Sequence, residues 1–394
     1  MSSAWPLVAL GEIFTIARGG SPRPIQEFLT DDPDGVNWVM ISDATQSSKY
    51  ITTTKKRIVK QGIKKSRMVH SGDFLLTNSM SFGKPYIMKT SGCIHDGWLV
   101  LSPCNGRVYP DYFYHLLGSN LVYAEFERRA AGATVKNLNI DLVRGVEVPL
   151  PPLSVQKRVA KLLDKVDTLR AKRRATLDQL DTLCQAIFSE MFGDPIQNPQ
   201  GYPIRKMIDI VDPKRPISYG ILMPGPDQTD GINYVRVVDM KDGGIQLSNI
   251  RKTTENISNA FRRSLLISGD LLMSIRGHVG RLAIVPAELE GANITQDTAR
   301  LAIQNMSSIF VLECLRTPAF QHWMAKHTKG VAVRGINLGD VKQMPIILPP
   351  RPAQDSFAQK ALAVARLKTA HRAALAEMDA LFASLQYRAF RGEL

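Results

Sequence analysis

The fold is decided by a ten-residue stretch that occurs twice, first as Asp34-Gly-Val-Asn-Trp-Val-Met-Ile-Ser-Asp43 and again as Asp230-Gly-Ile-Asn-Tyr-Val-Arg-Val-Val-Asp239. The two copies start 196 residues apart (230 − 34). Three further segments recur at offsets of 197 or 198, namely Ser71–Leu76 with Ser268–Met273, Val148–Pro152 with Ile346–Pro350, and Leu177–Leu183 with Leu375–Leu381. So constant an offset indicates tandem duplication of one unit of about 197 residues rather than a short solenoid repeat.

Each copy has a sheet-rich part followed by a helical part. Val36–Ser42 and Ile232–Val238 alternate loosely between apolar and polar residues, as half-buried strands do. Phe74–Leu76 and Leu271–Ile275 are apolar runs behind a Ser-Gly-Asp turn, and we expect an attached helix over 111–130. We predict an α+β fold with two similar mixed, sheet-dominated domains at residues 1–152 and 195–350, each followed by a helical region, at 153–194 and 351–394.

The helical regions carry the spacing of a coiled-coil seam. Ser154 is a good N-cap after two prolines, and Gly193-Asp-Pro195 ends the first helix. The predicted seam consists of Val155, Val159, Leu162, Val166 and Leu169, then, after a break at Arg173 and Thr176, of Leu177, Leu180, Cys184, Ile187 and Met191. Its counterpart consists of Phe357, Leu362, Val364, Leu367, Leu375, Met378, Phe382 and Leu385. We expect the two helices to pair as an antiparallel coiled coil with internal pseudo-two-fold symmetry.

Composition limits the class of protein. The 394 residues are 44% hydrophobic and carry a net charge of +14, which fits an ordered globular chain and excludes a disordered or collagen-like one. The apolar runs are too short for a transmembrane helix or a signal peptide. Four cysteines lie far apart without Cys-x-x-Cys spacing, so we expect no disulfide framework, no zinc site and a cytoplasmic location.

The basic excess is distributed along the whole chain. Residues 1–152 carry a net charge of +4, residues 153–194 carry +2, residues 195–350 carry +5 and residues 351–394 carry +3. This distribution favours a folded protein that lies along an extended polyanion such as nucleic acid. The alternative is ordinary solubility charge.

Catalytic motifs are missing. The sequence has no phosphate-binding GxxxxGK[ST] loop, no HExxH and no Asn/Asp-Pro-Pro-aromatic motif of an aminomethyltransferase. Cys93 next to His95-Asp96 is a conceivable nucleophile pair, but a capping or hydrogen-bonded loop role is favoured. We therefore expect a non-catalytic protein without a cofactor or metal of its own.

Two kinds of segment are candidates for binding. Lys55, Lys56, Lys64, Lys65 and Arg67 belong to a basic cluster, which either contacts phosphates or is a solvated face. The loop 77–84 matches the loop 274–281, and Gly132–Lys136 matches Gly330–Arg334. Both loops are rich in glycine and hydrogen-bonding side chains, so they are base-reading loops or structural hairpins. The candidate DNA-binding residues are Lys55, Lys56, Lys64, Lys65, Arg67, Asn78, Ser79, Ser81, Lys84, Lys136, Arg215, Tyr219, Arg276, His278, Arg281, Gln296 and Arg334.

Further motifs carry a resemblance to a known family. They are Pro149-Leu-Pro-Pro-Leu-Ser-Val-Gln156, Phe188-Ser-Glu-Met-Phe-Gly-Asp-Pro195, the chain end Leu385-Gln-Tyr-Arg-Ala-Phe-Arg-Gly-Glu-Leu394, Gly19-Gly-Ser-Pro22, His95-Asp-Gly-Trp98, Arg215-Pro-Ile-Ser-Tyr-Gly220 and Arg276-Gly-His-Val-Gly280. With the duplication, they make nearly the whole chain resemble the specificity subunit of type I restriction–modification enzymes. Arg351-Pro352 departs from the family pattern at the start of the second helix.

The resemblance implies a division of labour between chains. Each domain would be a target-recognition domain that reads one half of a bipartite double-stranded DNA sequence, and the helices would set the spacing of the halves. S-adenosylmethionine, ATP and Mg would bind partner chains, which are two methyltransferase subunits and motor-nuclease subunits. Off-seam apolar residues would dock the methyltransferases, and the candidates are Leu163, Leu183, Phe188, Met191, Phe192 and Phe390.

Overall fold

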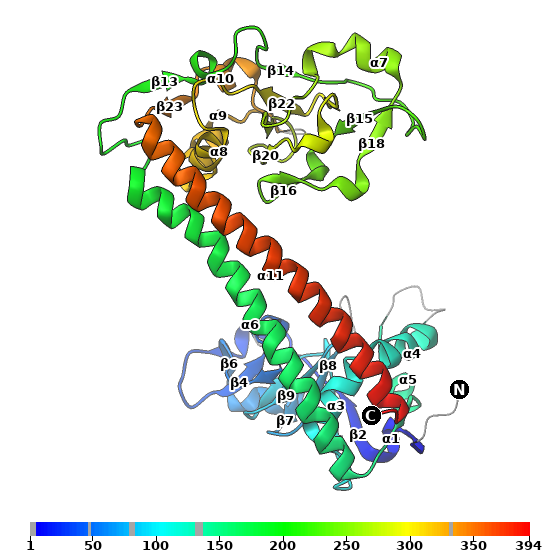
Figure 1. Cartoon of the computed structure of the whole chain (residues 1–394). Coiled ribbons are helices and arrows are strands. Elements are labelled where there is room, and N and C mark those ends of the chain that lie inside the picture. The colour runs from blue at the N-terminus through cyan, green and yellow to red at the C-terminus, as the bar shows by residue number, and fades with distance from the viewer. Residues whose placement is uncertain (1–4, 46–48, 79–82, 131–136, 331–333) are drawn as a thin grey trace. The chain divides into compact units, whose positions relative to one another are not determined.

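The computed structural model describes residues 5–45, 49–78, 83–130, 137–330 and 334–394. It divides into two compact units (Figure 1). Unit 1 comprises Met1–Arg174 with Ala373–Leu394, and unit 2 comprises Ala175–Arg372. The two long helices cross the boundary, so each unit holds one sheet-rich domain and parts of both helices.

Over the described residues, unit 1 contains two five-stranded sheets and one two-stranded ladder. The first sheet has the order β2 (Phe14–Arg18), β11 (Trp98–Pro103), β8 (Phe74–Thr77), β9 (Pro85–Met88), β5 (Tyr50–Ile51). The second has the order β3 (Leu29–Thr30), β6 (Lys56–Ile58), β4 (Val36–Val39), β10 (Gly92–Ile94), β7 (Arg67–Val69). The ladder pairs β1 (Leu7–Ala9) with β12 (Glu147–Pro149). The short helices are α1 (Leu10–Ile13), α2 (Ile41–Thr45), α3 (Pro110–Leu117), α4 (Asn120–Ala130) and α5 (Ile140–Arg144).

Unit 2 has a smaller set of sheets over its described residues. A four-stranded sheet has the order β14 (Ser218–Tyr219), β22 (Thr298–Leu301), β19 (Leu271–Ser274), β20 (Leu282–Ile284). A three-stranded sheet has the order β18 (Arg251–Thr253), β15 (Ile232–Val235), β21 (Asn293–Ile294). Two ladders pair β13 (Ile204–Lys206) with β23 (Pro345–Ile347), and β16 (Met240–Lys241) with β17 (Gly244–Ile245). The short helices are α7 (Glu255–Ala260), α8 (Ser308–Arg316), α9 (Pro318–His327) and α10 (Leu338–Lys342).

The central strands of both units are buried on both faces. In β8, Phe74 and Leu76 join the core that contains the helices, whereas Leu75 joins a separate core with Trp98 and Val39. In β19, successive residues alternate in the same way between two cores. Since neighbouring side chains of a strand point to opposite faces, each sheet is covered by helices on one side and by further strands on the other.

The repeated ten-residue stretch forms an equivalent strand in both units, followed by the α-helix α2 in unit 1 and by a 3-10 helix, Val237–Asp239, in unit 2. It forms β4 or β15, and each of these strands pairs in parallel with its neighbour β10 or β21. Both strands are shorter than expected, because a carboxylate turns the chain. The backbone N–H of Met40 donates to Asp43 Oδ2 (2.9 Å), and that of Arg236 donates to Asp239 Oδ2 (2.8 Å).

The single helix expected over 111–130 is instead two helices, α3 and α4. The chain turns at Gly118, whose backbone ends α3. Ser119 follows, and its hydroxyl accepts a hydrogen bond from the backbone N–H of Val122 (3.4 Å). A serine at this position is a preferred N-cap, so α4 starts afresh rather than continuing α3.

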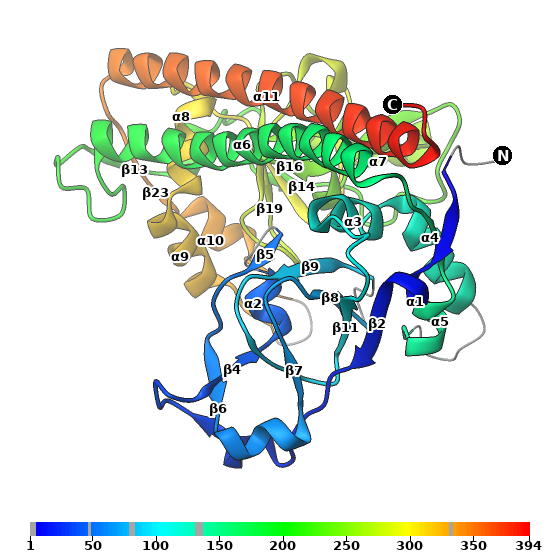
Figure 2. The same cartoon turned by 90° about the horizontal axis from the view of Figure 1, so that it is seen from below.

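The long helices are α6 (Leu153–Phe192) and α11 (Arg351–Arg391), which lie side by side in Figures 1 and 2. In unit 1, Arg170 Nε donates to Asp379 Oδ1 at 2.6 Å, and Arg158 donates to the backbone of Leu394. In unit 2, Lys368 Nζ lies 2.5 Å from Asp181 Oδ1. Residue numbers fall along α11 as they rise along α6, so the predicted antiparallel pairing is confirmed. Neither these helices nor any other helix in the described ranges is both long and apolar enough to cross a membrane.

The predicted seam is wrong at four leucines. Leu162, Leu169, Leu362 and Leu367 are 38–51% exposed. The buried side of α6 instead includes Leu163, one residue further on. The reason is that each helix packs against a globular domain as well as against its partner, which moves the buried stripe away from a strict two-helix seam.

Polar contacts also join each domain to α6. In unit 1, Asp164 Oδ1 lies 2.7 Å from both Lys49 Nζ and His115 Nε2. Burial alone would raise the pKa of Asp164, but the hydrogen bonds from His115 and Lys49 outweigh it and hold the pKa below its usual value. In unit 2, Gln185 Nε2 donates to Glu313 Oε2 at 2.8 Å.

Aromatic side chains anchor the ends of α6 and α11 inside the domains. Phe188 and Phe192 are fully buried against Phe310 and Phe357, with ring centroids 5.0–5.6 Å apart. Phe390 is buried against the ring of Tyr112.

Four of the six candidate docking residues therefore have a different role. Leu163, Phe188, Phe192 and Phe390 lie in the cores of their own units, at 0–2% exposure, and do not present a surface to a partner. Leu183, at 42% exposure, and the partly buried Met191 retain accessible surface.

Replacing Phe192 with alanine should lower the free energy of unfolding by about 3–5 kcal/mol, because the change empties a site in the aromatic core. Leu183→Ala on the same helix is the matched control and should cost well under half as much, because Leu183 is exposed. Urea denaturation followed by circular dichroism measures both. Equal losses would contradict the burial that separates the two side chains.

Candidate nucleic-acid interface

The centre of the candidate site in unit 2 is the hairpin loop between β19 and β20. Gly280 has φ +89°, and its N–H donates to the Ser274 carbonyl (3.0 Å). Ser274 Oγ accepts from the Arg281 N–H (2.8 Å), and Gln321 on α9 donates to the Gly280 carbonyl (3.2 Å). A Cβ at Gly280 would lie 2.9 Å from the Gln321 amide oxygen, so glycine is needed here for both conformation and space.

This fixed loop brings three predicted residues together. Arg276 Nη1 donates to Gln296 Oε1 at 3.2 Å, and the Gly277 N–H donates to the Arg334 carbonyl at 2.9 Å. Arg276 and Arg334 are exposed, and Gln296 is partly exposed. Segments far apart in the sequence thus present a hydrogen-bonded guanidinium and amide, and the backbone of a second exposed arginine adjoins the same loop.

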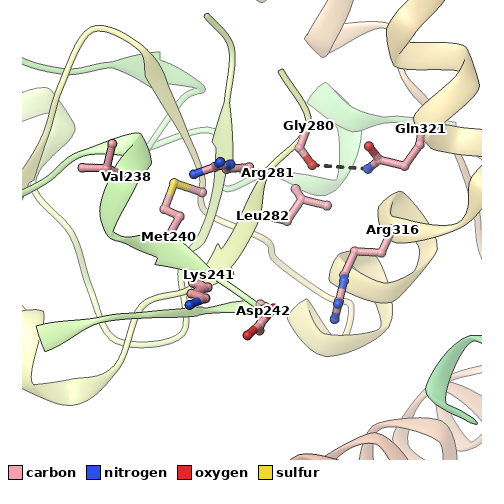
Figure 3. Close-up of a pocket in the computed structure, with 10 residues that line it drawn as sticks. Val238, Met240, Lys241, Asp242, Gly280, Arg281, Leu282, Arg316 and Gln321 are labelled. Atoms are coloured by element: carbon pink, nitrogen blue, oxygen red, sulfur yellow. Dashed lines mark hydrogen bonds between the residues drawn. The ribbon is translucent and has the colours of Figure 1, made fainter. Parts of the chain in front are cut away.

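Recesses border the loop. One, of about 560 Å³, is lined by His278, Arg334, Thr328 and Gln321. Another, of about 500 Å³, is lined by Arg281, Lys241, Arg316 and Gln321 (Figure 3). Gln321 lines both, and Figure 3 shows its hydrogen bond to Gly280. The loop is therefore flanked by cationic, open recesses rather than by an enclosed catalytic cavity.

Tyr219 lies next to this group, whereas Arg215 is held within the fold. Tyr219 is 48% exposed, and two residues further on the Ile221 carbonyl accepts from the Gln296 N–H (2.8 Å). Arg215 makes a bidentate ion pair with the buried Asp270, with hydrogen bonds of 2.8 and 2.6 Å. A guanidinium engaged in this way supports the domain rather than reaching into a groove.

Unit 1 has an equivalent hairpin with a different surface. Gly83 has φ +79° and donates to the Thr77 carbonyl (2.7 Å), and Thr77 Oγ1 accepts from the Lys84 N–H (3.2 Å). Lys84 is exposed, but Asn78 is buried and donates to the Asp96 carbonyl (2.7 Å). The candidates Ser79, Ser81 and Lys136 lie outside the described residues.

The basic cluster of unit 1 is exposed throughout but does not form one compact patch. Lys56 lies on β6 and Arg67 on the edge strand β7, with β4 and β10 between them. Three strand spacings are about 14 Å. The remaining members lie on the loop before β6 and on a 3-10 helix, and they are Lys55, Lys64 and Lys65.

The cysteine–histidine pair has the geometry of a loop, not of a nucleophile. Burial raises the pKa of the Cys93 thiol and lowers the pKa of His95. His95 Nδ1 accepts from the Gly97 N–H at 2.9 Å. A reactive thiol requires a lowered pKa, which is the opposite of what is found. In the described part of the chain, no three His, Cys, Asp or Glu side chains gather as metal ligands would.

Sequence reasoning missed two cations near Tyr219, namely Lys214 and Arg300. They line a recess of about 420 Å³ with Arg215, Arg262 and Arg263, of which the last two belong to the basic segment of the second repeat, for which phosphate contact or a solvated face was expected. The sequence shows that these cations are present but not that they converge, because they come from segments that are distant along the chain.

Comparison with known proteins agrees with this architecture. Residues 2–180 match the family model described as the type I restriction modification DNA specificity domain. The EcoBI specificity subunit of Escherichia coli is 29% identical over 313 residues, 72% of this chain and 65% of that protein. The EcoKI specificity subunit of E. coli is 22% identical over 100% of this chain and 90% of its own length. The chain thus spans slightly less than two thirds of the EcoBI subunit.

Solved structures share the fold. A chain from a study of complex assembly and conformational transition of the type I restriction–modification system matches with a TM-score of 0.61 and 19% identity, over 99% of this chain and 98% of that one. The type I specificity subunit of M. genitalium matches with a TM-score of 0.56 and 13% identity, over 98% and 96%. Residues 2–180 thus match the type I specificity domain, and by its relatives and its fold the whole chain is similar to the specificity subunits of type I restriction–modification systems.

Proposed function

We propose that the chain recognises double-stranded DNA, and that each globular domain reads one half of a bipartite sequence. The observation that carries this proposal is the convergence of Arg276, Gln296 and Arg334 at one edge of unit 2, beside open cationic recesses. The names of the relatives, which are specificity subunits, support it.

Arg276 and Gln296 suit direct reading of bases. In the major groove, a guanidinium pairs with the two acceptors of guanine, and a glutamine amide pairs with the acceptor and donor of adenine. The hydrogen bond between Arg276 and Gln296 orders both side chains before DNA arrives, which reduces the entropy lost on binding. The exposed cations around them would hold the backbone phosphates.

Arg276→Ala should relax the sequence read by unit 2 at one base pair, at a cost of about 1–3 kcal/mol for that pair. The measurement is the adenine-methylation motif of cells that carry the variant as their only specificity subunit. The half-site read by unit 1 should stay unchanged. Arg205→Ala, an exposed arginine on β13, is the control and should leave both half-sites intact. A motif unaltered by Arg276→Ala would show that the loop is structural.

We also propose that the chemistry belongs to partner chains. Two methyltransferase subunits would bind S-adenosylmethionine, and motor-nuclease subunits would use ATP and Mg. The exposed leucines of the long helices offer a docking surface. In unit 1 they include Leu162 and Leu169 on α6, which are seven residues apart and so share one face of that helix.

The double variant Leu162→Asp with Leu169→Asp should reduce co-purification of the methyltransferase at least tenfold, because it places two charges on a surface that would be buried. Its unfolding midpoint should stay near that of the wild type, since both side chains are exposed. Full co-purification would place the docking surface elsewhere. Loss of folding would contradict the exposure of the two leucines.

The helices would set the spacing of the half-sites. Four residues inserted after Arg173 in α6 and four after His371 in α11 leave the Arg170–Asp379 and Lys368–Asp181 pairs in register within their own units. Each insertion lengthens its helix by about 6 Å, or roughly two base pairs at ~3.4 Å per pair. The methylation motif should therefore gain one or two unread base pairs with both halves intact. An active enzyme with an unchanged spacer would contradict the proposal that the helices set the spacing of the half-sites.

A further inference from the structure

The recess beside β14 in unit 2 carries an unbalanced positive charge. Its lining includes five cations, Lys214, Arg215, Arg262, Arg263 and Arg300, and a single acid, Glu290. Arg215 forms an ion pair with Asp270 (2.6 Å), and the side chain of Asp270 is buried. Five cations against two acids leave a net charge of +3 around a recess of about 420 Å³.

Arg300 is the most deeply buried of these cations. It is 3% exposed, and its guanidinium donates to the carbonyls of Leu265 and Pro216, each at 3.0 Å. Its Nε has no hydrogen-bond partner among the described residues, and no carboxylate there pairs with it. Arg215 donates to the same Leu265 carbonyl (3.2 Å), so two guanidiniums are held close together.

A buried cation of this kind is costly unless an anion approaches it. Burial, followed by repulsion from Arg215, lowers the pKa of Arg300, and the opposite effects of Asp270 and Asp212 do not outweigh them. Arg262 and Arg263 are exposed at the rim, where they are free to reach an incoming ligand. Tetrahedral phosphate oxygens are the anions that such clusters of guanidinium groups bind best.

The recess also has a defined position relative to the base-reading pair. Ser218 Oγ donates to the Arg263 carbonyl (3.1 Å), and three residues further on the Ile221 carbonyl accepts from the Gln296 N–H. Three residues of extended chain span about 10 Å. This is comparable with the ~12 Å width of the major groove, so a side chain in the groove and a cation on its edge fit the same segment of duplex.

We propose that this recess clamps a DNA backbone phosphate next to the half-site that unit 2 reads. The proposal rests on the DNA-binding function proposed above. The clamp contacts no base, so it adds affinity for every sequence and fixes the register in which Arg276 and Gln296 meet their base pairs.

The test compares two double variants of the full-length chain that remove the same charge. Arg262→Ala with Arg263→Ala removes the rim of the recess, and Arg205→Ala with Lys206→Ala removes two exposed cations from β13. Dissociation constants are measured between 50 and 200 mM salt on duplexes with and without the methylated motif. The rim variant should lower the slope of log K against log[salt] by about 0.9 for each lost phosphate contact, and should weaken both duplexes by the same factor. The control should keep the wild-type slope.

Equal slopes for the two variants would overturn the clamp. A wild-type chain that does not distinguish the two duplexes would instead overturn the proposed function, so the two failures are separable. Inorganic phosphate provides a second arm, with the thermal midpoint measured in phosphate and in chloride of equal ionic strength. Phosphate stabilisation that the rim variant loses, combined with an unchanged DNA slope, would identify a site for free phosphate and would also overturn the clamp.

Discussion

Everything else in this molecule depends on the burial of two helices in the cores of two domains. Phe188 and Phe192 are part of the core of unit 2, and Phe390 is part of the core of unit 1. The helices are thus structural members of the domains and not appended linkers. Their charged contacts, Arg170 with Asp379 and Lys368 with Asp181, occupy equivalent positions 198 residues apart in the two copies. The ion pair between α6 and α11 is therefore repeated at equivalent positions in the two units.

The candidate reading surface depends on that core through the central hairpins. Because β19 is buried on both faces, its position is fixed, and the loop that follows it has little freedom at its root. Ser274, Gly280 and Gln321 then determine the shape of the loop by hydrogen bonds. Rigid support of exposed polar side chains is the arrangement that recognition requires, since a misplaced donor loses most of its discrimination.

Sequence reasoning found the architecture because duplication and helical periodicity are written along the chain. It also proposed Arg276 and Gln296 together, although 20 residues separate them, and the structure brings them into contact. It placed Leu162 in the seam and Leu163 on the docking surface, whereas Leu162 is exposed and Leu163 is buried, because a helix that faces both a partner helix and a domain has a wider buried stripe than a heptad describes. Arg300 was missed for a related reason. The charged residues around it come from three separate segments, and the sequence near an arginine in a strand does not show which distant residues will contact it.

The unequal continuity of the two units has a consequence for biosynthesis. Unit 2 is one uninterrupted segment, whereas unit 1 closes only with the last 22 residues, Ala373–Leu394, which bring Ala389 and Phe390 into its core. The domain that is translated first is therefore the one that is completed last. While unit 2 is being made, the apolar surface that will receive Phe390 has no covering helix end, and a nascent chain in that state exposes surface that chaperones bind. Loss of the C-terminal residues, through premature termination or proteolysis, would accordingly destabilise unit 1, whose other residues lie at the N-terminal end of the chain.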